Sequence, residues 1–356
     1  MSRSPPIHHS SFSIHHSPAP YDALLLVSFG GPEKPEDVLP FLENVVRGKN
    51  VPRERLLQVA ERYRLFGGAS PINEQNRALL RALVAELNAH GPPLAVYWGN
   101  RNWHPLLPDT LQQMADDGIR RALAFVTSAF GSYPGCRQYL EDVQRAREAA
   151  GPQAPQVEKL RLFFNHPGFI EAMADRVLAA LEEIPAERRQ AARLAYTAHS
   201  LPVQMALSSP YQTQLAEACR LVSERIGRAE WDLVYQSRSA AGRGPPQAWL
   251  ESDVKDHLRR LQEAGSVKDV VLVPIGFVSE HIEVVYDLDV EAVGLGEQLG
   301  ISVVRAGVVG THPRFVTMIR ELIQERIAEC PTRLALGTLG PWPDDCPAGC
   351  CVPQRP

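Results

Sequence analysis

The sequence predicts an α/β protein with two Rossmann-like domains, each a parallel sheet flanked by helices. The chain has 356 residues, which exceeds one ordinary core and suits two domains of roughly 150 residues each. Short apolar runs without alternation, typical of strands buried on both faces, recur along the chain between longer amphipathic patterns. Strands and helices in alternation indicate parallel sheets with helices on both faces.

The predicted elements follow from these two kinds of pattern. Buried strands are expected at Ala23–Phe29, Ala95–Trp98, Ala122–Ala129, Lys159–Phe164, Arg193–Thr197, Trp231–Tyr235 and Val270–Phe277. Amphipathic helices are expected at Asn73–Asn88, Pro105–Asp116, Gln138–Ala149, Phe169–Glu183, Gln212–Ile226 and Pro313–Glu329. Ligands of such folds bind beyond the carboxyl ends of the strands, so the residues just after each run are the first candidates for a site.

Composition shifts divide the chain into four parts. Residues 1–20 are rich in His, Ser and Pro and lack the basic start and apolar stretch of a secretion signal, which predicts a disordered tail. The stretch Gly151–Val157, with two prolines, indicates a boundary between an N-terminal α/β domain at 21–155 and a C-terminal α/β domain at 156–330. Residues 331–356 form a cysteine-containing tail.

Charge and hydropathy exclude two classes of partner. The formal net charge is −4 and the basic residues form no stripe, which argues against nucleic-acid binding. No apolar run approaches the roughly 18 residues that span a bilayer, so no transmembrane segment is expected. We therefore expect a cytoplasmic protein, in which the six cysteines have little use as structural disulfides.

Three carboxylates stand four residues apart after the last predicted strand. Glu283, Asp287 and Glu291 form one slowly drifting stripe on an α-helix, and a wider π-type turn aligns them better. A solvated acidic face is the ordinary explanation of such a stripe. Here the intervening residues are apolar around most of the helix, which predicts a buried helix and carboxylates with partners or a function. Such a row suits a hard divalent cation or a proton relay.

A histidine follows the strand predicted at Arg193–Thr197. A lone histidine is more often a structural residue, but the position of His199 at the carboxyl end of a strand favours catalysis. Ser200 suggests a hydrolase, yet no glycine-flanked nucleophile elbow surrounds it.

Several of these segments together resemble the ferrochelatase family. Thr197-Ala-His-Ser-Leu-Pro202 is similar to the family's catalytic histidine motif, and residues 274–289 (PIGFVSEHIEVVYDLD) are similar to its metal-site motif. Further matches, in the same order, are Ser28-Phe-Gly-Gly-Pro32, Phe66-Gly-Gly-Ala-Ser-Pro-Ile72, Gln236-Ser-Arg238 and Trp249-Leu250. The resemblance covers residues 22–330 and implies a chelatase-like fold and the insertion of Fe²⁺ into a porphyrin in haem biosynthesis.

The resemblance also implies roles for individual residues. His199 and Glu283 match the pair to which the family assigns iron binding and removal of the pyrrole protons, so both are expected to be catalytic. Asp287 and Glu291 match a carboxylate trail leading from that pair and complete the expected metal-binding set. The positions that match the surroundings of the porphyrin are Phe29, Arg47, Arg62, Tyr63, Ser70, Tyr133 and Trp249.

Two of these positions depart from the best-known Gram-positive members. Those enzymes carry an iron-ligating tyrosine where this chain has Phe29, and paired arginines where it has Val46-Arg47. Phenylalanine at this position resembles the actinobacterial subgroup, in which the Tyr133 position is a candidate to approach the metal. Actinobacterial members act on coproporphyrin III, which is therefore the favoured substrate, with protoporphyrin IX as the alternative.

The cysteines suggest a second metal centre. Some ferrochelatases bind a [2Fe–2S] cluster through one internal cysteine and three near the C-terminus, and Cys136 matches the internal position. Cys346, Cys350 and Cys351 are the expected tail ligands, and Cys330 is the alternative because adjacent cysteines are awkward as simultaneous ligands. A zinc site and an unused tail are the other interpretations.

Three expected partners and two rival functions complete the prediction. The expected partners are the porphyrin, an iron donor and neighbouring enzymes of the haem pathway. A cobalt or nickel chelatase shares the architecture, but such relatives often carry extra histidines at the metal site. A non-enzymatic haem or metal carrier has no need of both a base and a carboxylate trail.

Overall fold

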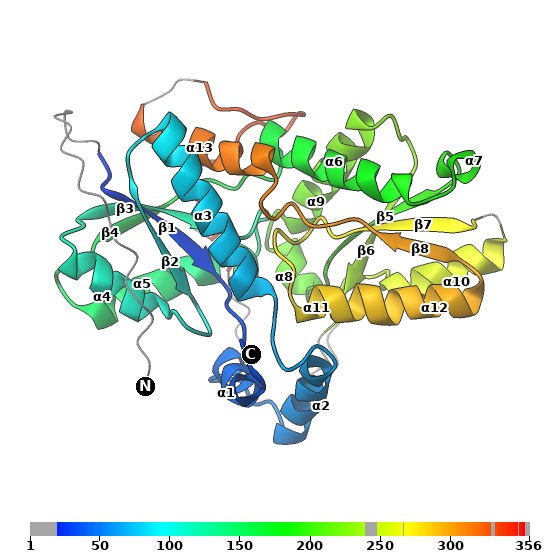
Figure 1. Cartoon of the computed structure of the whole chain (residues 1–356), viewed down its shortest axis with the longest axis horizontal. Coiled ribbons are helices and arrows are strands. Elements are labelled where there is room, and N and C mark those ends of the chain that lie inside the picture. The colour runs from blue at the N-terminus through cyan, green and yellow to red at the C-terminus, as the bar shows by residue number, and fades with distance from the viewer. Residues whose placement is uncertain (1–19, 239–247, 266, 329–331, 348, 353–356) are drawn as a thin grey trace.

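The computed structural model describes residues 20–238, 248–265, 267–328, 332–347 and 349–352. These residues form two four-stranded parallel sheets with helices on both faces, which confirms the predicted fold class (Figure 1). The expected disordered tail at 1–20 lies outside the described residues except for Pro20, and so does Cys330. No helix in the described part of the chain is long and apolar enough to cross a membrane.

The first sheet has the strand order β2-β1-β3-β4. Its strands are β1 (Ala23–Ser28), β2 (Ala95–Asn100), β3 (Arg121–Val126) and β4 (Gln156–Lys159). Alternate residues of β1 point to opposite faces: Leu24 and Leu26 pack in one core cluster with Leu83 of α3 (Ile72–His90). Leu25 lies in another with Leu111 of α4 (Leu107–Asp116), beside α5 (Gln138–Ala150). Both faces of β1 are covered, which explains its unbroken apolar sequence.

The second sheet repeats this plan with the order β6-β5-β7-β8. Its strands are β5 (Arg193–His199), β6 (Trp231–Gln236), β7 (Asp269–Val273) and β8 (Ser302–Arg305). In Figure 1, one face carries α6 (Pro167–Glu182), α7 (Ala186–Arg189) and α9 (Tyr211–Arg225), with α8 (Val203–Leu207) near the sheet edge. The other face carries α10 (Val254–Ala264), α11 (Ile282–Val284), the π-helix η3 (Val285–Ala292) and α12 (Val293–Leu299).

A separate pair of helices follows β1. The short helix η1 (Pro35–Asp37) leads into α1 (Val38–Val45) and α2 (Arg53–Arg64), which lie below both sheets in Figure 1. Their apolar cluster includes Phe41 and Tyr63 and reaches Ile282 and Tyr286 of the second half. These two helices of the first half therefore contact the helix that carries the acidic stripe.

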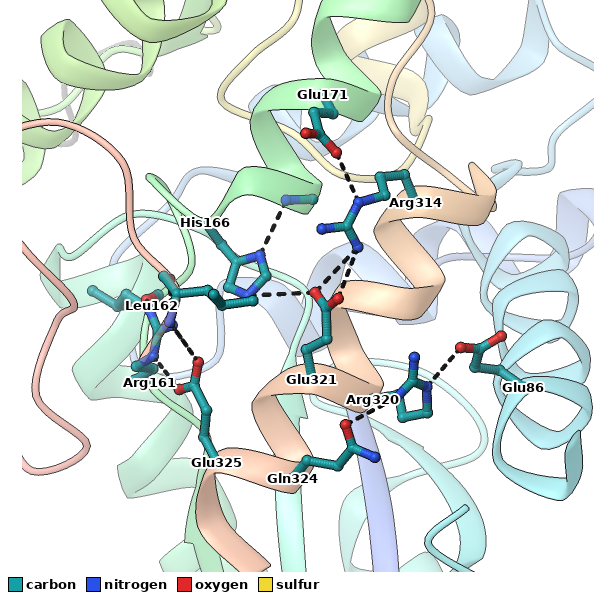
Figure 2. A network of polar contacts seen from close by, with 12 residues as sticks. Glu86, Arg161, Leu162, His166, Glu171, Arg314, Arg320, Glu321, Gln324 and Glu325 are labelled. Carbon is teal, nitrogen blue, oxygen red and sulfur yellow. Dashed lines mark hydrogen bonds and ion pairs between the residues drawn. The ribbon is translucent and has the colours of Figure 1, made fainter. Parts of the chain in front are cut away.

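One apolar core joins the two halves, and α13 (Pro313–Ile327) bridges them by packing against α3 and α6. Ion pairs fix this helix (Figure 2). Buried Arg161 donates to both carboxylate oxygens of Glu325 at 2.7 and 2.8 Å. Arg314 donates to Glu171 of α6 at 2.7 Å, and Arg320 donates to Glu86 of α3 at 2.8 Å. A buried, hydrogen-bonded ion pair such as Arg161–Glu325 is costly to break, because either partner alone leaves an uncompensated charge.

The strand expected at Lys159–Phe164 is wrong. The structure has β4 at Gln156–Lys159, where it pairs with β3. Leu160–Phe164 are buried because they enter the core between the two halves rather than because they lie in a sheet. A short apolar run looks the same in both settings. The expected domain boundary after residue 155 thus falls inside the first sheet, because β4 belongs to it.

Residues 334–342 of the tail after α13 lie against the second half of the chain. Buried Asn165 donates to the carbonyl oxygens of Leu336 and Gly340 at 3.2 and 2.8 Å. The Trp342 ring packs edge-on against Phe164, and Glu217 of α9 accepts from the Thr338 N–H at 3.1 Å. Hydrogen bonds between buried side chains and backbone groups of the tail therefore hold residues 334–342 in place.

Candidate active site

His199 is the last residue of β5, at the carboxyl edge of the second sheet. Its Nδ1 lies 2.6 Å from the Ser200 carbonyl oxygen, which only accepts hydrogen bonds, so Nδ1 carries the proton and donates. Nε2 then holds the lone pair. Tyr211 donates its hydroxyl to the His199 carbonyl oxygen at 3.0 Å. The imidazole is thereby held in the tautomer that makes Nε2 a base.

A glycine permits the close approach of the next loop to His199. A Cβ atom on Gly276 would lie 2.8 Å from Cα of Ala198, so a larger residue there would push the loop away. The Gly276 N–H donates to the Thr197 carbonyl oxygen at 3.0 Å. This loop leads directly to α11, which brings Glu283 opposite His199, with 3.9 Å between Nε2 and Oε2.

The three carboxylates lie on a helix that is partly π-helical. Glu283 lies in α11, and Asp287 and Glu291 lie in η3, so the wider turn that aligns them is present. The expectation of a buried helix is confirmed only in part. Ile282, Val284 and Leu288 are buried, but Val290 is exposed and the Glu283 side chain is 54% exposed.

Asp287 is the buried member of the stripe, with a side chain only 8% exposed. The Ser237 hydroxyl donates to one of its oxygens, and Arg62 Nη1 lies 3.4 Å from the other. Burial raises the pKa of Asp287 to about 6, and the charge of Glu283 adds to this, while Ser237 and Arg62 oppose it. Asp287 therefore exchanges its proton near neutral pH.

The outer member of the stripe, Glu291, is neutralised by a lysine. Lys255 of α10 donates to Glu291 Oε2 at 2.7 Å, and both side chains are about one-third exposed. Among the described residues, no group of three or more His, Cys, Asp or Glu side chains is arranged to hold one metal ion. In the stripe, Asp287 is paired with Arg62 and Glu291 with Lys255, so two of the three carboxylates already have basic partners.

Aromatic side chains surround the stripe on the side of α1 and α2. Phe29, just after β1, packs edge-on against Phe41 with ring centroids 6.2 Å apart, and Trp103 packs against the same ring. Tyr63 of α2 is buried beside them. Burial, and then the charge of Glu283, raises the pKa of the Tyr63 hydroxyl, which keeps it protonated.

The remaining residues expected near the porphyrin differ in burial and in their present partners. Ser70 is buried just before α3, and Trp249 pairs with Pro202, a few residues after His199. Arg47 is exposed, and its guanidinium bonds to Asn44. The Tyr133 hydroxyl donates to Glu141 at 3.0 Å, so it would have to leave Glu141 before it could approach a metal.

The structure brings together the four cysteines expected to bind a cluster. Cys136 and Cys350 lie near enough to Cys346 to act on its pKa, and the Sγ atoms of Cys350 and Cys351 are 3.5 Å apart. Arg137, next to Cys136, donates to the Cys350 carbonyl oxygen at 3.2 Å. All four cysteines line one cavity of about 620 Å³. The neighbouring thiol of Cys136 lowers the pKa of Cys346 to about 6, which favours the thiolate form of Cys346.

Sequence reasoning did not assign three residues that contact the site. Ser237 and Lys255 bind the carboxylate stripe, and Tyr211 supports His199. A signal existed for Ser237, which directly follows β6 at the carboxyl edge of the sheet. Lys255 and Tyr211 lie in helices whose sequences look ordinary, so nothing in the pattern distinguishes them.

Solved structures of low sequence identity share the fold. SirB from Bacillus subtilis with Fe³⁺ matches with a TM-score of 0.51 and 13% identity, covering 87% of this chain and 96% of that one. The sirohydrochlorin chelatase SirB from Bacillus subtilis subspecies spizizenii, in complex with cobalt, matches with a TM-score of 0.50 and 11% identity, covering 88% and 99%.

Comparison of the sequences identifies the family. The ferrochelatase family model matches residues 21–327. The ferrochelatase of Rhodopirellula baltica is 55% identical over 95% of both chains. The coproporphyrin III ferrochelatase of Frankia alni is 55% identical over 94% of this chain and 87% of its own, and that of Streptomyces coelicolor is 50% identical over 95% of both. The chain therefore belongs to the ferrochelatase family, enzymes that insert ferrous iron into a porphyrin during haem biosynthesis.

Proposed function

We propose that this ferrochelatase inserts Fe²⁺ into coproporphyrin III, with His199 and Glu283 as its central pair. The observation that carries the proposal is the 3.9 Å separation of a histidine base and a carboxylate supplied by different elements of the second sheet. Insertion requires a base for two pyrrole protons and a weak ligand for the incoming ion. Histidine titrates near neutrality, and carboxylate suits hard Fe²⁺ without trapping it.

On the base side, His199 accepts a pyrrole proton at Nε2. Its Nδ1–H stays bonded to the Ser200 carbonyl oxygen, so the resulting imidazolium keeps its orientation. Glu283 stabilises that positive charge, being the carboxylate nearest to Nε2. Asp287, one turn further along the stripe and with a pKa of about 6, is suited to pass a proton outward.

On the metal side, Glu283 accepts the Fe²⁺ first because its side chain is the most exposed of the stripe. Asp287 and Glu291 extend the set once their basic partners move. Three oxygen donors in a row hold the ion loosely enough to release it to the porphyrin.

The porphyrin lies against the aromatic side chains near the stripe. Phe29, Tyr63 and Trp249 offer apolar faces to the macrocycle. Arg47 and Arg62 pair with its carboxylates, and Ser70 and Tyr133 complete the expected contacts. Coproporphyrin III carries four carboxylates and protoporphyrin IX carries two. The actinobacterial relatives named coproporphyrin III ferrochelatases support the first substrate.

We propose further that Cys136, Cys346, Cys350 and Cys351 hold a [2Fe–2S] cluster. Four thiolates are the usual ligand set of such a cluster, and these four cysteines line one cavity, with the sulfurs of Cys350 and Cys351 3.5 Å apart. Cys346 is the natural first ligand because its pKa of about 6 leaves it ionised. When bound, the cluster supplies a covalent link between the tail and the start of α5.

The free thiols support a cytoplasmic location. All five cysteines in the described part of the chain are unpaired, as expected where thiols are kept reduced. In that compartment an iron donor delivers the Fe²⁺ and a neighbouring enzyme of the haem pathway takes the product.

The test is anaerobic Fe²⁺ insertion, followed through the porphyrin absorption spectrum. Coproporphyrin III is expected to give the higher kcat/KM, because more carboxylates make charge-assisted contacts with the protein. Equal or reversed preference between the two porphyrins contradicts the substrate proposal. Failure to insert Fe²⁺ into either one contradicts the whole assignment.

A further inference from the structure

Arg62 has two carboxylate partners, one proposed and one observed, and its single guanidinium does not bind both fully at the same time. It is proposed to bind a porphyrin carboxylate, yet in the structure it pairs with Asp287 of the metal stripe. We propose that Arg62 exchanges between these carboxylates, so that porphyrin binding releases Asp287 for the metal. This inference rests on the proposed function, and it makes Arg62 a residue that couples the two substrates.

The pair has the geometry of a contact that is readily exchanged. Arg62 Nη1 and Asp287 Oδ1 are 3.4 Å apart, beyond the 2.7–2.9 Å of a strong charge-assisted hydrogen bond. The Arg62 side chain is 32% exposed, and its guanidinium lies over the Tyr286 ring with 4.5 Å to the centroid. The other N–H groups of the fork therefore remain available for a second acceptor.

Asp287 keeps its position when the arginine leaves. The Ser237 hydroxyl holds its other oxygen from the end of β6, independently of α2. The backbone around Asp287 is fixed by the buried neighbours Val284 and Leu288. Departure of Arg62 thus leaves the Asp287 carboxyl group without its basic partner, in a fixed place next to Glu283.

A porphyrin carboxylate is a strong competitor for this guanidinium. An accessible carboxylate accepts two parallel N–H bonds from arginine, whereas Asp287 receives one long contact. The adjacent Tyr63 is buried with Phe41, which fixes α2 while the Arg62 side chain changes partner. The exchange therefore needs side-chain rotation and no movement of α2.

The thermodynamic consequence is reciprocal coupling between the two substrates. If porphyrin removes a cation from Asp287, it raises the affinity of the stripe for a divalent ion, and the ion raises the affinity for porphyrin by the same factor. Lys255 holds Glu291 in a similar ion pair, but it lies on α10, away from α2, and is not expected to respond to porphyrin.

The test is a double-mutant cycle on porphyrin affinity, measured by fluorescence titration of coproporphyrin III without metal. Asp287→Asn frees Arg62 and is expected to tighten binding roughly fivefold, the lower end of usual coupling factors. Arg62→Met retains the apolar stem over Tyr286 and is expected to weaken binding. The double variant is expected to match Arg62→Met, because without the guanidinium nothing is released.

Asp289→Asn is the matched control, since Asp289 lies on the same helix but pairs with Arg305. It removes the same charge and is expected to leave porphyrin affinity unchanged. Tightening by Asp287→Asn that persists in the Arg62→Met background, or that equals the effect of Asp289→Asn, overturns the exchange. So does unchanged affinity in Arg62→Met.

A second measurement tests the metal side with Mn²⁺ as a redox-stable probe. In porphyrin-free protein, Arg62→Met is expected to bind Mn²⁺ more tightly than wild type, whereas Arg62→Lys, which keeps the charge, is expected to resemble wild type. Equal Mn²⁺ affinity in all three proteins contradicts the exchange. Iron insertion by the wild type is assayed separately, so this failure is distinguishable from failure of the proposed function.

Discussion

The Nε2 atom of His199 faces Oε2 of Glu283 at 3.9 Å, although the two residues come from β5 and α11. The separation is longer than a hydrogen bond. Each residue has a hydrogen bond on the side away from the other. His199 Nδ1 bonds to the Ser200 carbonyl oxygen, and Gln236 Nε2 donates to the Glu283 carbonyl oxygen at 3.4 Å. The pair is thus oriented by the scaffold rather than by its own contact, and a reacting group can enter between its members.

The first prediction concerns this pair. His199→Ala and Glu283→Gln are each expected to lower kcat for iron insertion by about a hundredfold or more, the usual contribution of a positioned acid or base. Circular dichroism and thermal melting check that the fold survives. Glu297→Gln, an exposed position on α12, serves as a control with normal turnover. Near-normal kcat in either variant of the pair removes that residue from the mechanism.

The sequence predicted the parts of this site that depend on local pattern. The carboxylate spacing indicated the stripe, and η3 is a π-helix, the wider turn that aligns carboxylates at this spacing better than an α-helix does. The position of His199 followed from the end of an apolar run. These features depend on residues close together in the chain, and side-chain periodicity reveals them.

Other parts depend on partners far away in the chain and could not be predicted. The pairing of Arg62 with Asp287 depends on how α2 lies against η3. Nothing in the sequence of either helix indicates that the two are in contact. The strand at β4 was misplaced because the apolar residues Leu160, Leu162, Phe163 and Phe164 belong to the core between the two halves and not to a sheet. The sequence also does not predict that Asn165 anchors the tail, because its acceptors are backbone carbonyl groups, which every residue has.

The second prediction concerns pH and His166, which lies in the network of Figure 2. Its Nδ1 accepts from the Gly168 N–H at the start of α6, and burial, helped by the charges of Arg161 and Arg314, lowers its pKa to about 3. The unfolded chain takes up this proton near pH 6.5 and the folded chain does not. The free energy of unfolding therefore falls as pH drops from 6.5 towards 3, by at most about 1.4 kcal/mol per pH unit from this group.

Denaturant unfolding at pH 5 and pH 7 measures that slope. His166→Asn retains an acceptor for the Gly168 N–H but has no titrating group, so its stability is expected to change less between the two pH values. The absolute stability of the variant does not matter here. Parallel pH dependence in the two proteins contradicts the account of His166.

The third prediction concerns the backbone at Ser237. This residue has a φ of 58°, in the left-handed region that costs non-glycine residues about 1 kcal/mol. Ser237→Gly and Ser237→Ala both remove the hydroxyl that donates to Asp287, but only glycine relieves the strain. The glycine variant is expected to be more stable than the alanine variant by about 1 kcal/mol in chemical denaturation. Equal stabilities would mean that the turn relaxes when the hydroxyl is lost.

The last prediction concerns the four thiols. Protein purified anaerobically is expected to be reddish-brown, with about two non-substrate irons and two sulfides per chain, as a [2Fe–2S] centre requires. Cys136→Ser is expected to lose the colour although Cys136 lies in the π-helical turn Tyr133–Arg137 just before α5, far from the tail in sequence. The same variant is expected to melt earlier, because without the cluster the end of the tail loses its covalent link to the first half and keeps hydrogen bonds such as that from Arg137 to Cys350. Cys219→Ser is the control: Cys219 is a buried thiol of α9 away from the cavity, so its variant is expected to keep the colour.

Separate variants of Cys350, Cys351 and Cys330 identify the three tail ligands by loss of colour. A colourless, iron-free wild type from cells with intact cluster assembly contradicts the cluster and leaves the ferrochelatase activity unaffected.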